Sequence, residues 1–170
     1  FGLALVQGQD LDKRLSDLAT RLATLIRENS KKKVTVLDFT DLQGNSNEMG
    51  KYIAEDLTVN LVILKRDYAV LDRANLRKIL LEHKLTATGL VDPENAKKLG
   101  QFAGVDAFIL GTVIPKNERM VVTAKIISTD TAEIVGATKS EFTSDEQVQQ
   151  PSPRFPRDEA TRGYDPSRSL

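Results

Sequence analysis

Three groups of residues have types and spacings that could support chemistry, and the first is a glycine-lysine segment. Gly44, Gly50 and Lys51 follow a predicted strand and open a predicted helix, as in a phosphate-binding loop. That loop has four residues between its glycines and a Ser or Thr after its Lys. Here five residues separate the two glycines, and Tyr52 follows Lys51. We therefore interpret the segment as a flexible loop followed by a capped helix.

The second group centres on His83, which is the sole histidine of the sequence. It falls near the C-terminal end of a helix predicted over residues 73–83, where the helix dipole favours a partly charged imidazole. A catalytic triad would also need an aligned serine and a carboxylate, and no pattern indicates them. We expect a surface or helix-end histidine, and we expect no enzyme.

The third group consists of aspartates at the ends of predicted elements. Helix caps and turns explain most of them. The same oxygen ligands also build calcium sites, although no EF-hand spacing is present. Apart from a calcium ion, which could sit between subunits, no cofactor is expected. The calcium candidates are Asp38, Asp41 and Asp130.

The elements that must position these residues follow from hydrophobic periodicity. Apolar residues at helical spacing predict a helix over residues 11–28, with Asp10 as its N-cap. The β-branched, apolar run 34–39 predicts a buried strand. A second helix follows Asn45 and Glu48, which resemble a capping box. Its inward face is expected to hold Met49, Tyr52, Ile53, Leu57, Leu61 and Leu64.

The rest of the chain predicts two further helices. Asp72 caps the helix over residues 73–83, and Asp92 with Pro93 begins a helix that Gly104 ends. Their inward residues are expected to be Leu76, Ile79 and Leu80 in the first, and Ala96, Leu99, Phe102 and Ala103 in the second. Further strands are predicted at 68–71, 106–114, 119–128 and 133–142.

The order of these elements predicts the fold class. The first two strands are joined through a helix and should be parallel, whereas the last three should form an antiparallel meander. We therefore expect an α/β (α+β) fold with a mixed five-stranded sheet and about four helices. Gly111 inside a strand indicates a close backbone approach or a bulge.

The two ends of the chain differ from the α/β domain expected over residues 10–143. Residues 1–9 are an apolar arm, and we keep three interpretations: the tail of a signal peptide, a short pairing strand, or a plain arm. Residues 144–170 form a charged tail that holds four of the six prolines. The residues expected to make interactions at these ends are Phe1, Leu3, Leu5, Phe155 and Tyr164.

Composition narrows the classes of partner. Twenty-four basic residues balance twenty-four acidic ones, so the chain has no overall field to attract nucleic acid, and no nucleic-acid partner is expected. The absence of cysteine excludes disulfides, thiolate metal sites and a cysteine nucleophile within this sequence. No stretch approaches the roughly 20 apolar residues that span a bilayer, so no transmembrane segment is expected.

A run of short motifs, taken in order, resembles the CsgG/FlgO group of curli secretion channel subunits and flagellar outer-membrane assembly proteins. The resemblance covers about residues 11–143, and the activator LpoB and the N-terminal domain of TolB are looser relatives in fold. The motifs are Lys33–Phe39, Gly50–Leu57, Val70–Arg73, Thr88–Pro93, Gly104–Ala107, Leu110–Thr112, Ala124–Ile127 and Glu133–Val135.

The resemblance implies an exported protein of the periplasm, the outer membrane or the cell exterior, without catalysis. This chain departs from the curli channel because it lacks a lipidated cysteine and long loops for transmembrane hairpins, so we expect no pore. Ala132 stands where relatives usually have Gly in the last hairpin turn, so either a positive φ there is strained or the turn differs. Arg73 is expected to pair locally or with the end of the sheet.

Our leading hypothesis is a non-enzymatic envelope or extracellular assembly protein that self-associates into a ring, a filament or a scaffold. The alternative is a monomeric periplasmic module that binds an envelope protein or a small ligand. Particle mass in solution separates these two hypotheses.

Overall fold

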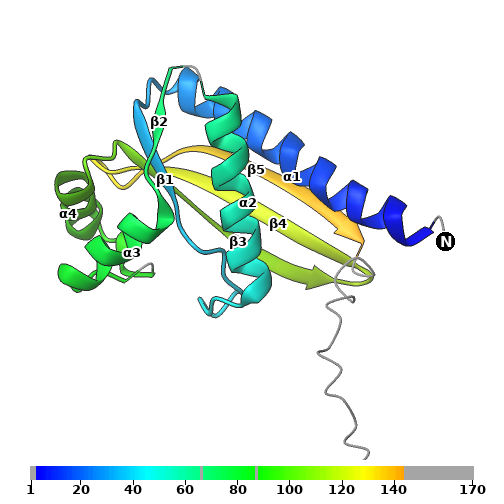
Figure 1. The fold of residues 1–170 in the computed structure, drawn as a ribbon. Coiled ribbons are helices and arrows are strands. Elements are labelled where there is room, and N and C mark those ends of the chain that lie inside the picture. The colour runs from blue at the N-terminus through cyan, green and yellow to red at the C-terminus, as the bar shows by residue number, and fades with distance from the viewer. Residues whose placement is uncertain (1–2, 66, 87, 144–170) are drawn as a thin grey trace, which may run out of the picture.

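The protein is a sheet with two helices on each face (Figure 1). The structure is a computed structural model that describes residues 3–65, 67–86 and 88–143, with side chains from residue 10 onward. In chain order the elements are α1 (Leu3–Glu28), β1 (Lys33–Val36), α2 (Glu48–Leu64), β2 (Ala69–Val70), α3 (Arg73–Glu82), the 3-10 helix η1 (Thr88–Val91), α4 (Pro93–Ala103), β3 (Ala107–Lys116), β4 (Arg119–Ser128) and β5 (Ile134–Thr143).

The strands lie in the order β2-β1-β3-β4-β5. β1 is parallel to both β2 and β3, while β3, β4 and β5 form an antiparallel meander. The predicted fold class, a mixed five-stranded sheet with four helices, is confirmed. β1 ends earlier than predicted, at Val36, but the chain still follows β3, because the N–H of Leu37 donates to the carbonyl of Ile109.

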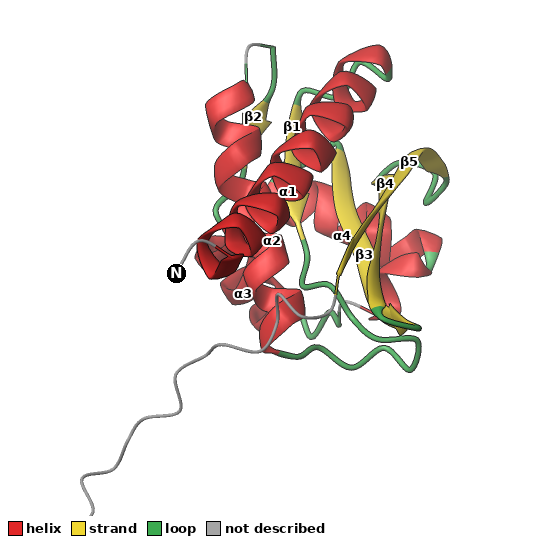
Figure 2. Cartoon of the chain, turned by 90° about the vertical axis from the view of Figure 1, so that its right-hand side faces the viewer, coloured by secondary structure: helices red, strands yellow, loops and turns green. Residues whose placement is uncertain are grey.

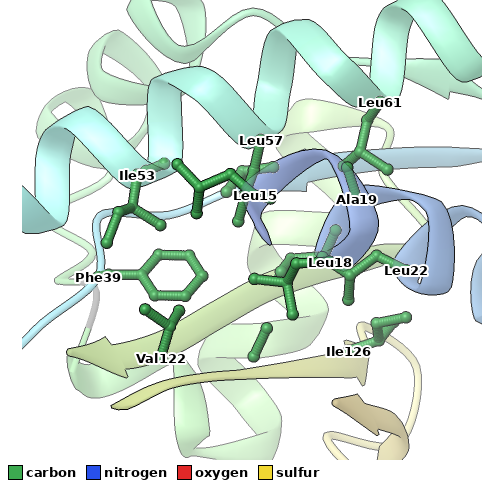
Figure 3. Packing of buried hydrophobic residues seen from close by; sticks show 14 of the residues in the cluster. Leu15, Leu18, Ala19, Leu22, Phe39, Ile53, Leu57, Leu61, Val122 and Ile126 are labelled. Atoms are coloured by element: carbon green, nitrogen blue, oxygen red, sulfur yellow. The ribbon is translucent and has the colours of Figure 1, made fainter. Parts of the chain in front are cut away.

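The larger core lies between the sheet and the pair α1 and α2 (Figure 3). The predicted apolar stripe of α1 packs here against α2, and the ring of Phe39 lies among residues from α2 and the sheet. Central members of this core are Leu15, Leu18, Leu22, Phe39, Ile53, Leu57, Leu61, Val122 and Ile126. Burying large aliphatic side chains contributes about 1.5–3 kcal/mol each, so this face dominates stability.

The opposite face of the sheet is covered by α3, η1 and α4. In the turned view of Figure 2, α4 lies behind β3. Its core comprises Leu37, Leu76, Leu85, Leu90, Ala96, Leu99, Ala103, Val105, Phe108 and Ile127. The predicted caps form as expected: Asp72 and Asp92 accept hydrogen bonds from the first turns of α3 and α4, and Gly104 ends α4 with a φ of 64°.

The start of α1 differs from the prediction. The helix begins at Leu3, so Asp10 is no N-cap; its carboxylate instead pairs with Arg14 at 3.5 Å, one turn later. Leu, Ala and Gln are good helix formers, and they extend the helix toward the N-terminus. The interpretation of residues 1–9 as a pairing strand is therefore wrong for residues 3–9, while Phe1 lies outside the described residues.

Three smaller predictions are also corrected. α2 is capped by Asn47, whose Oδ1 accepts from the N–H of Gly50 at 2.8 Å, and not by Asn45. Tyr52 is 46% exposed because Ile53 takes the inward position beside it. Phe102 is 48% exposed and stacks on His83.

At two backbone positions the structure decides between the alternatives that the sequence left open. A Cβ atom on Gly111 would lie 2.0 Å from the carbonyl oxygen of Thr123, so this glycine marks a close approach between strands. Ala132 has a φ of 58°, a left-handed conformation that a residue with a Cβ adopts at a cost. No helix among the described residues combines the length and the hydropathy of a membrane-spanning segment.

Candidate functional site

The most unusual side chain of the protein is a buried arginine at the carboxyl end of β1. Arg73 is the first residue of α3, and only 6% of its side chain is exposed. Its Nη2 donates to Oδ1 of Asp38, its Nη1 lies 3.5 Å from the carbonyl oxygen of Val36, and its Nε lies 3.1 Å from Oε2 of Glu55. The predicted pairing of Arg73 with the sheet end is thus found.

Local capping explains why Arg73 points toward the sheet. Oδ2 of Asp72 accepts from the N–H groups of Ala74 at 2.9 Å and Asn75 at 3.3 Å, which places Arg73 at the first helical position. Glu55 belongs to α2, on the other face of the sheet. The guanidinium therefore joins the two helix layers around the end of β1.

The Nε of Arg73 is within ion-pair range of Glu55, but among the described residues this buried nitrogen has no hydrogen-bond partner. A guanidinium stays protonated in proteins, so it serves neither as a base nor as a nucleophile. The arrangement can hold carboxylates in place, and we interpret it as a clamp between layers.

A small cavity of about 200 Å³ adjoins this clamp on the β3 side. It lies outside the carboxyl end of β1, where ligands bind in open α/β sheets. Its lining is mostly apolar and includes three threonines, with Asp38 at the clamp side: Leu37, Asp38, Thr40, Thr88, Val91, Leu110, Gly111 and Thr112. The cavity suits a small, largely apolar group.

Asp41 organises the loop between β1 and α2. Its Oδ1 accepts from the N–H groups of Gln43 and Asn45, each at 2.9 Å. The hydrogen bond from the Asn45 N–H is the largest influence and lowers the pKa of the Asp41 carboxyl; burial opposes this, and the side chain of Asn45 and the N–H groups of Gln43 and Gly44 lower the pKa further.

We expect the Asp41 carboxyl to titrate below its usual value of 3.8 in the folded protein. Because the folded pKa is depressed, ionised Asp41 favours the folded state above the unfolded pKa, and this effect is lost as the pH falls through the folded pKa. Carboxyl carbon shifts measured by NMR should show the low midpoint, with the Asn45 amide following it. The urea-unfolded chain is the control, and an equal midpoint in both states would contradict the prediction.

The calcium candidates occupy separate environments. Asp38 pairs with Arg73, Asp41 binds its own loop, and Asp130 lies in the turn between β4 and β5. Among residues 3–65, 67–86 and 88–143, no group of three or more His, Asp or Glu side chains is placed to hold a metal ion. Calcium binding stays a prediction.

The other two groups of possible chemistry have structural roles. His83 lies at the C-terminal end of α3 and stacks on Phe102 of α4, with ring centroids 3.5 Å apart. Gly50 lets α2 lie close to the backbone at Phe39, because a Cβ on Gly50 would lie 2.0 Å from the carbonyl oxygen of Phe39. Lys51 pairs with Glu48 at 3.1 Å.

The predicted interaction residues lie mostly beyond what the structure describes. Phe1, Phe155 and Tyr164 are outside the described residues, and Leu3 and Leu5 are described only as backbone of α1. Two other surfaces were missed by the sequence analysis. One is a hollow of about 400 Å³ between α1 and the edge strand β5, lined by Asp10, Arg14, Arg21, Arg119 and residues 139–143.

The second surface is an apolar stripe on the outer face of α2, formed by Tyr52, Val59, Val62 and Ile63. Ile63 is 72% exposed. Burial raises the pKa of the neighbouring Asp56, and the charge of Asp12 raises it further. A carboxylate at the border of an apolar stripe is typical of a protein contact surface, where the rim is polar.

Comparison with a family model gives one match that spans most of the domain. The model described as FlgO protein matches residues 16–147. No curated protein sequence matches the chain.

Solved structures show the same fold at low identity. The C-terminal domain of LpoB from Escherichia coli has a TM-score of 0.61 and 12% identity, and the match covers 79% of this chain and 98% of that one. The same domain from Salmonella enterica has a TM-score of 0.60, with the same identity and coverage. The predicted resemblance to FlgO and, in fold, to LpoB is confirmed.

Proposed function

This chain belongs to the FlgO protein family, and from that premise we propose that it is an exported, non-enzymatic protein of the cell envelope that acts by self-association. The family resemblance described from the sequence implies export and an envelope location. The LpoB likeness supports the fold on which the proposal depends. A thermal-shift screen with nucleotides and divalent cations tests the non-enzymatic part.

One observation carries the proposal of self-association. The sheet ends in β5, an edge strand of ten residues, and none of the described residues pairs with its outer side. An exposed edge presents a row of backbone donors and acceptors and is a template for pairing with another chain. Charged side chains of both signs lie beside this edge, in the hollow against α1.

We expect the full chain to exceed the 18.8 kDa monomer mass in multi-angle light scattering, with a concentration-dependent approach to an integral multiple. Edge pairing is a bimolecular equilibrium, so dilution should return the monomer. Electron microscopy then distinguishes a dimer or another small particle from a ring or a filament. A mass of one chain at every concentration would contradict self-association.

The second candidate function is a monomeric module that binds an envelope protein or a small ligand. The apolar stripe on α2 and the cavity beside Asp38 favour it, because exposed apolar patches and apolar cavities are common binding sites. A monomer that binds one envelope partner saturably would support this function in place of self-association.

A further inference from the structure

The outer side of β5 differs from the opposite edge of the sheet. β2, at the other edge, has two residues, whereas β5 has ten and contains no proline. The hollow beside β5 follows five consecutive residues, 139–143, so it runs along the strand backbone. Figure 1 shows α1 lying over this side of the sheet. The hollow thus has the position and the length needed for an added strand.

The charges along β5 are self-complementary. In a two-fold antiparallel pairing centred on Ser140, Lys139 lies directly opposite Glu141 of the partner subunit, and Glu141 lies opposite Lys139 of the partner subunit. Both side chains stand on the face away from α1, because residues alternate along a strand and Ser140 and Phe142 are buried toward α1. Directly opposite charges of unlike sign stabilise a strand pair, and like charges destabilise it.

The charges along the outer side of α1 are also self-complementary. Asp10, Arg14, Asp17 and Arg21 follow one another at helical spacing with alternating sign, and Asp10, Arg14 and Arg21 line the hollow. Two such stripes placed antiparallel bring Asp10 opposite the partner's Arg21, and Arg14 opposite the partner's Asp17. All four positions then meet an opposite charge. The centre of this arrangement lies between Leu15 and Ser16.

The two centres lie at similar distances from the point where α1 crosses β5. A Cβ on Gly136 would lie 3.3 Å from Cβ of Leu25, which fixes where α1 crosses β5. Four residues along β5, from Gly136 to Ser140, span about 13 Å at about 3.3 Å per residue. Nine residues back along α1 span about the same distance at 1.5 Å per residue and lead from Leu25 to Ser16. One two-fold axis perpendicular to the sheet can therefore serve both pairings.

From this coincidence we propose that two copies of this chain pair through β5, antiparallel and centred on Ser140, with their α1 helices side by side on the same face. The result is a ten-stranded sheet with an isologous interface. This inference rests on the proposed self-association and names its surface. The other segment that could occupy the edge is the chain's own residues 144–170, which follow directly after β5.

Charge reversal tests the pairing in the full chain. Lys139→Glu and Glu141→Lys each place like charges opposite one another twice per dimer, and each should weaken dimerisation at least about tenfold. Within one subunit Glu141 also pairs with Arg119 at 3.3 Å, and the double variant K139E/E141K loses that contact. It restores opposite charges between the two β5 strands, so it should bind more tightly than either single variant and bring the dissociation constant back toward the original. Sedimentation velocity over a dilution series measures all four proteins.

A matched control is Lys98→Glu, which reverses an exposed charge on α4 and should leave the dimer unchanged. Urea unfolding of each variant confirms that the subunit itself stays folded. If the parent associates and both single variants keep its dissociation constant, the β5 pairing is overturned and the proposed function is not. If the parent is a monomer at all concentrations, both are overturned. A full chain that is monomeric and dimerises only when shortened to residue 143 would place residues 144–170 on the edge and overturn the inference.

The register has its own test, because the chain contains no native cysteine. Pairing about Ser140 puts Ala137 opposite Thr143 of the partner subunit, while two copies of either position lie about 20 Å apart along the strands. A mixture of Ala137→Cys and Thr143→Cys proteins should form a covalent dimer on mild oxidation, and either protein alone should not. Cross-linking of either variant alone at the rate of the mixture would overturn the register.

Discussion

Replacing Gly111 with alanine is expected to lower the free energy of unfolding by about 3 kcal/mol or more, at the upper end of overpacking costs. The new Cβ would lie 2.0 Å from the carbonyl oxygen of Thr123 and 2.3 Å from Cε1 of Phe39. The first contact is with the backbone of a central strand, and the second is with a fully buried ring. Neither neighbour can move away without disturbing β4 or the larger core.

Gly136→Ala is the matched control for this substitution. Its Cβ would meet side-chain atoms of Ile126 and Leu25, all at 3.3 Å, and these can shift by a few tenths of an ångström. Chemical unfolding of both variants in urea measures the difference. A Gly111→Ala protein as stable as Gly136→Ala would show that β3 and β4 are not as closely apposed at this point as the structure has them.

The contrast between these two glycines shows what sequence patterns can predict. An isolated glycine in a strand indicates a close approach, which is correct for Gly111, but the pattern does not say which atoms approach. The helix face of residues 11–26 and the bounds of β4 were also predictable, because both depend on local periodicity. The caps at Asp72 and Asp92 are local as well, since each bonds to the turn that follows it.

The failures occur where tertiary contacts decide between equivalent local choices. Asn45 and Asn47 are both suitable caps for α2, and the hydrogen bonds of Asp41 fix Asn45 in the loop. Tyr52 and Ile53 compete for one inward position, and the packing of α2 on α1 selects Ile53. In each pair the sequence offers two candidates, and only the packed fold selects one.

The candidate sites are less predictable than the elements because they combine distant segments. The sequence places Arg73 at a helix start, but Asp38 and Glu55 reach it only after α2 and α3 pack on opposite faces of the sheet. The alternating charges of residues 10–21 and of Lys139 and Glu141 are visible in the sequence. Their meaning depends on the strand order, which leaves β5 at the edge.

The clamp at Arg73 is also the site of the second large effect, and Arg73→Met is expected to lower the free energy of unfolding by about 2–4 kcal/mol. Methionine keeps much of the apolar stem but removes the guanidinium, leaving Asp38 and Glu55 without a cation between them. Removing one partner of a buried ion pair costs about 3–5 kcal/mol, and the partial exposure of both carboxylates reduces that figure.

Arg77→Met provides the control on the same helix, because Arg77 is exposed and a surface substitution of this kind changes stability by about 0.5 kcal/mol or less. Arg73→Lys separates charge from geometry: an ammonium reaches one carboxylate but lacks the planar fork, so we expect an intermediate loss. Urea unfolding curves of the three variants give the comparison. Since Arg73 joins the two helix layers while β5 lies at the far edge, the Arg73→Met protein should dimerise as tightly as the parent wherever it is folded. Equal losses of unfolding free energy in Arg73→Met and Arg77→Met would show that the clamp does not stabilise the fold.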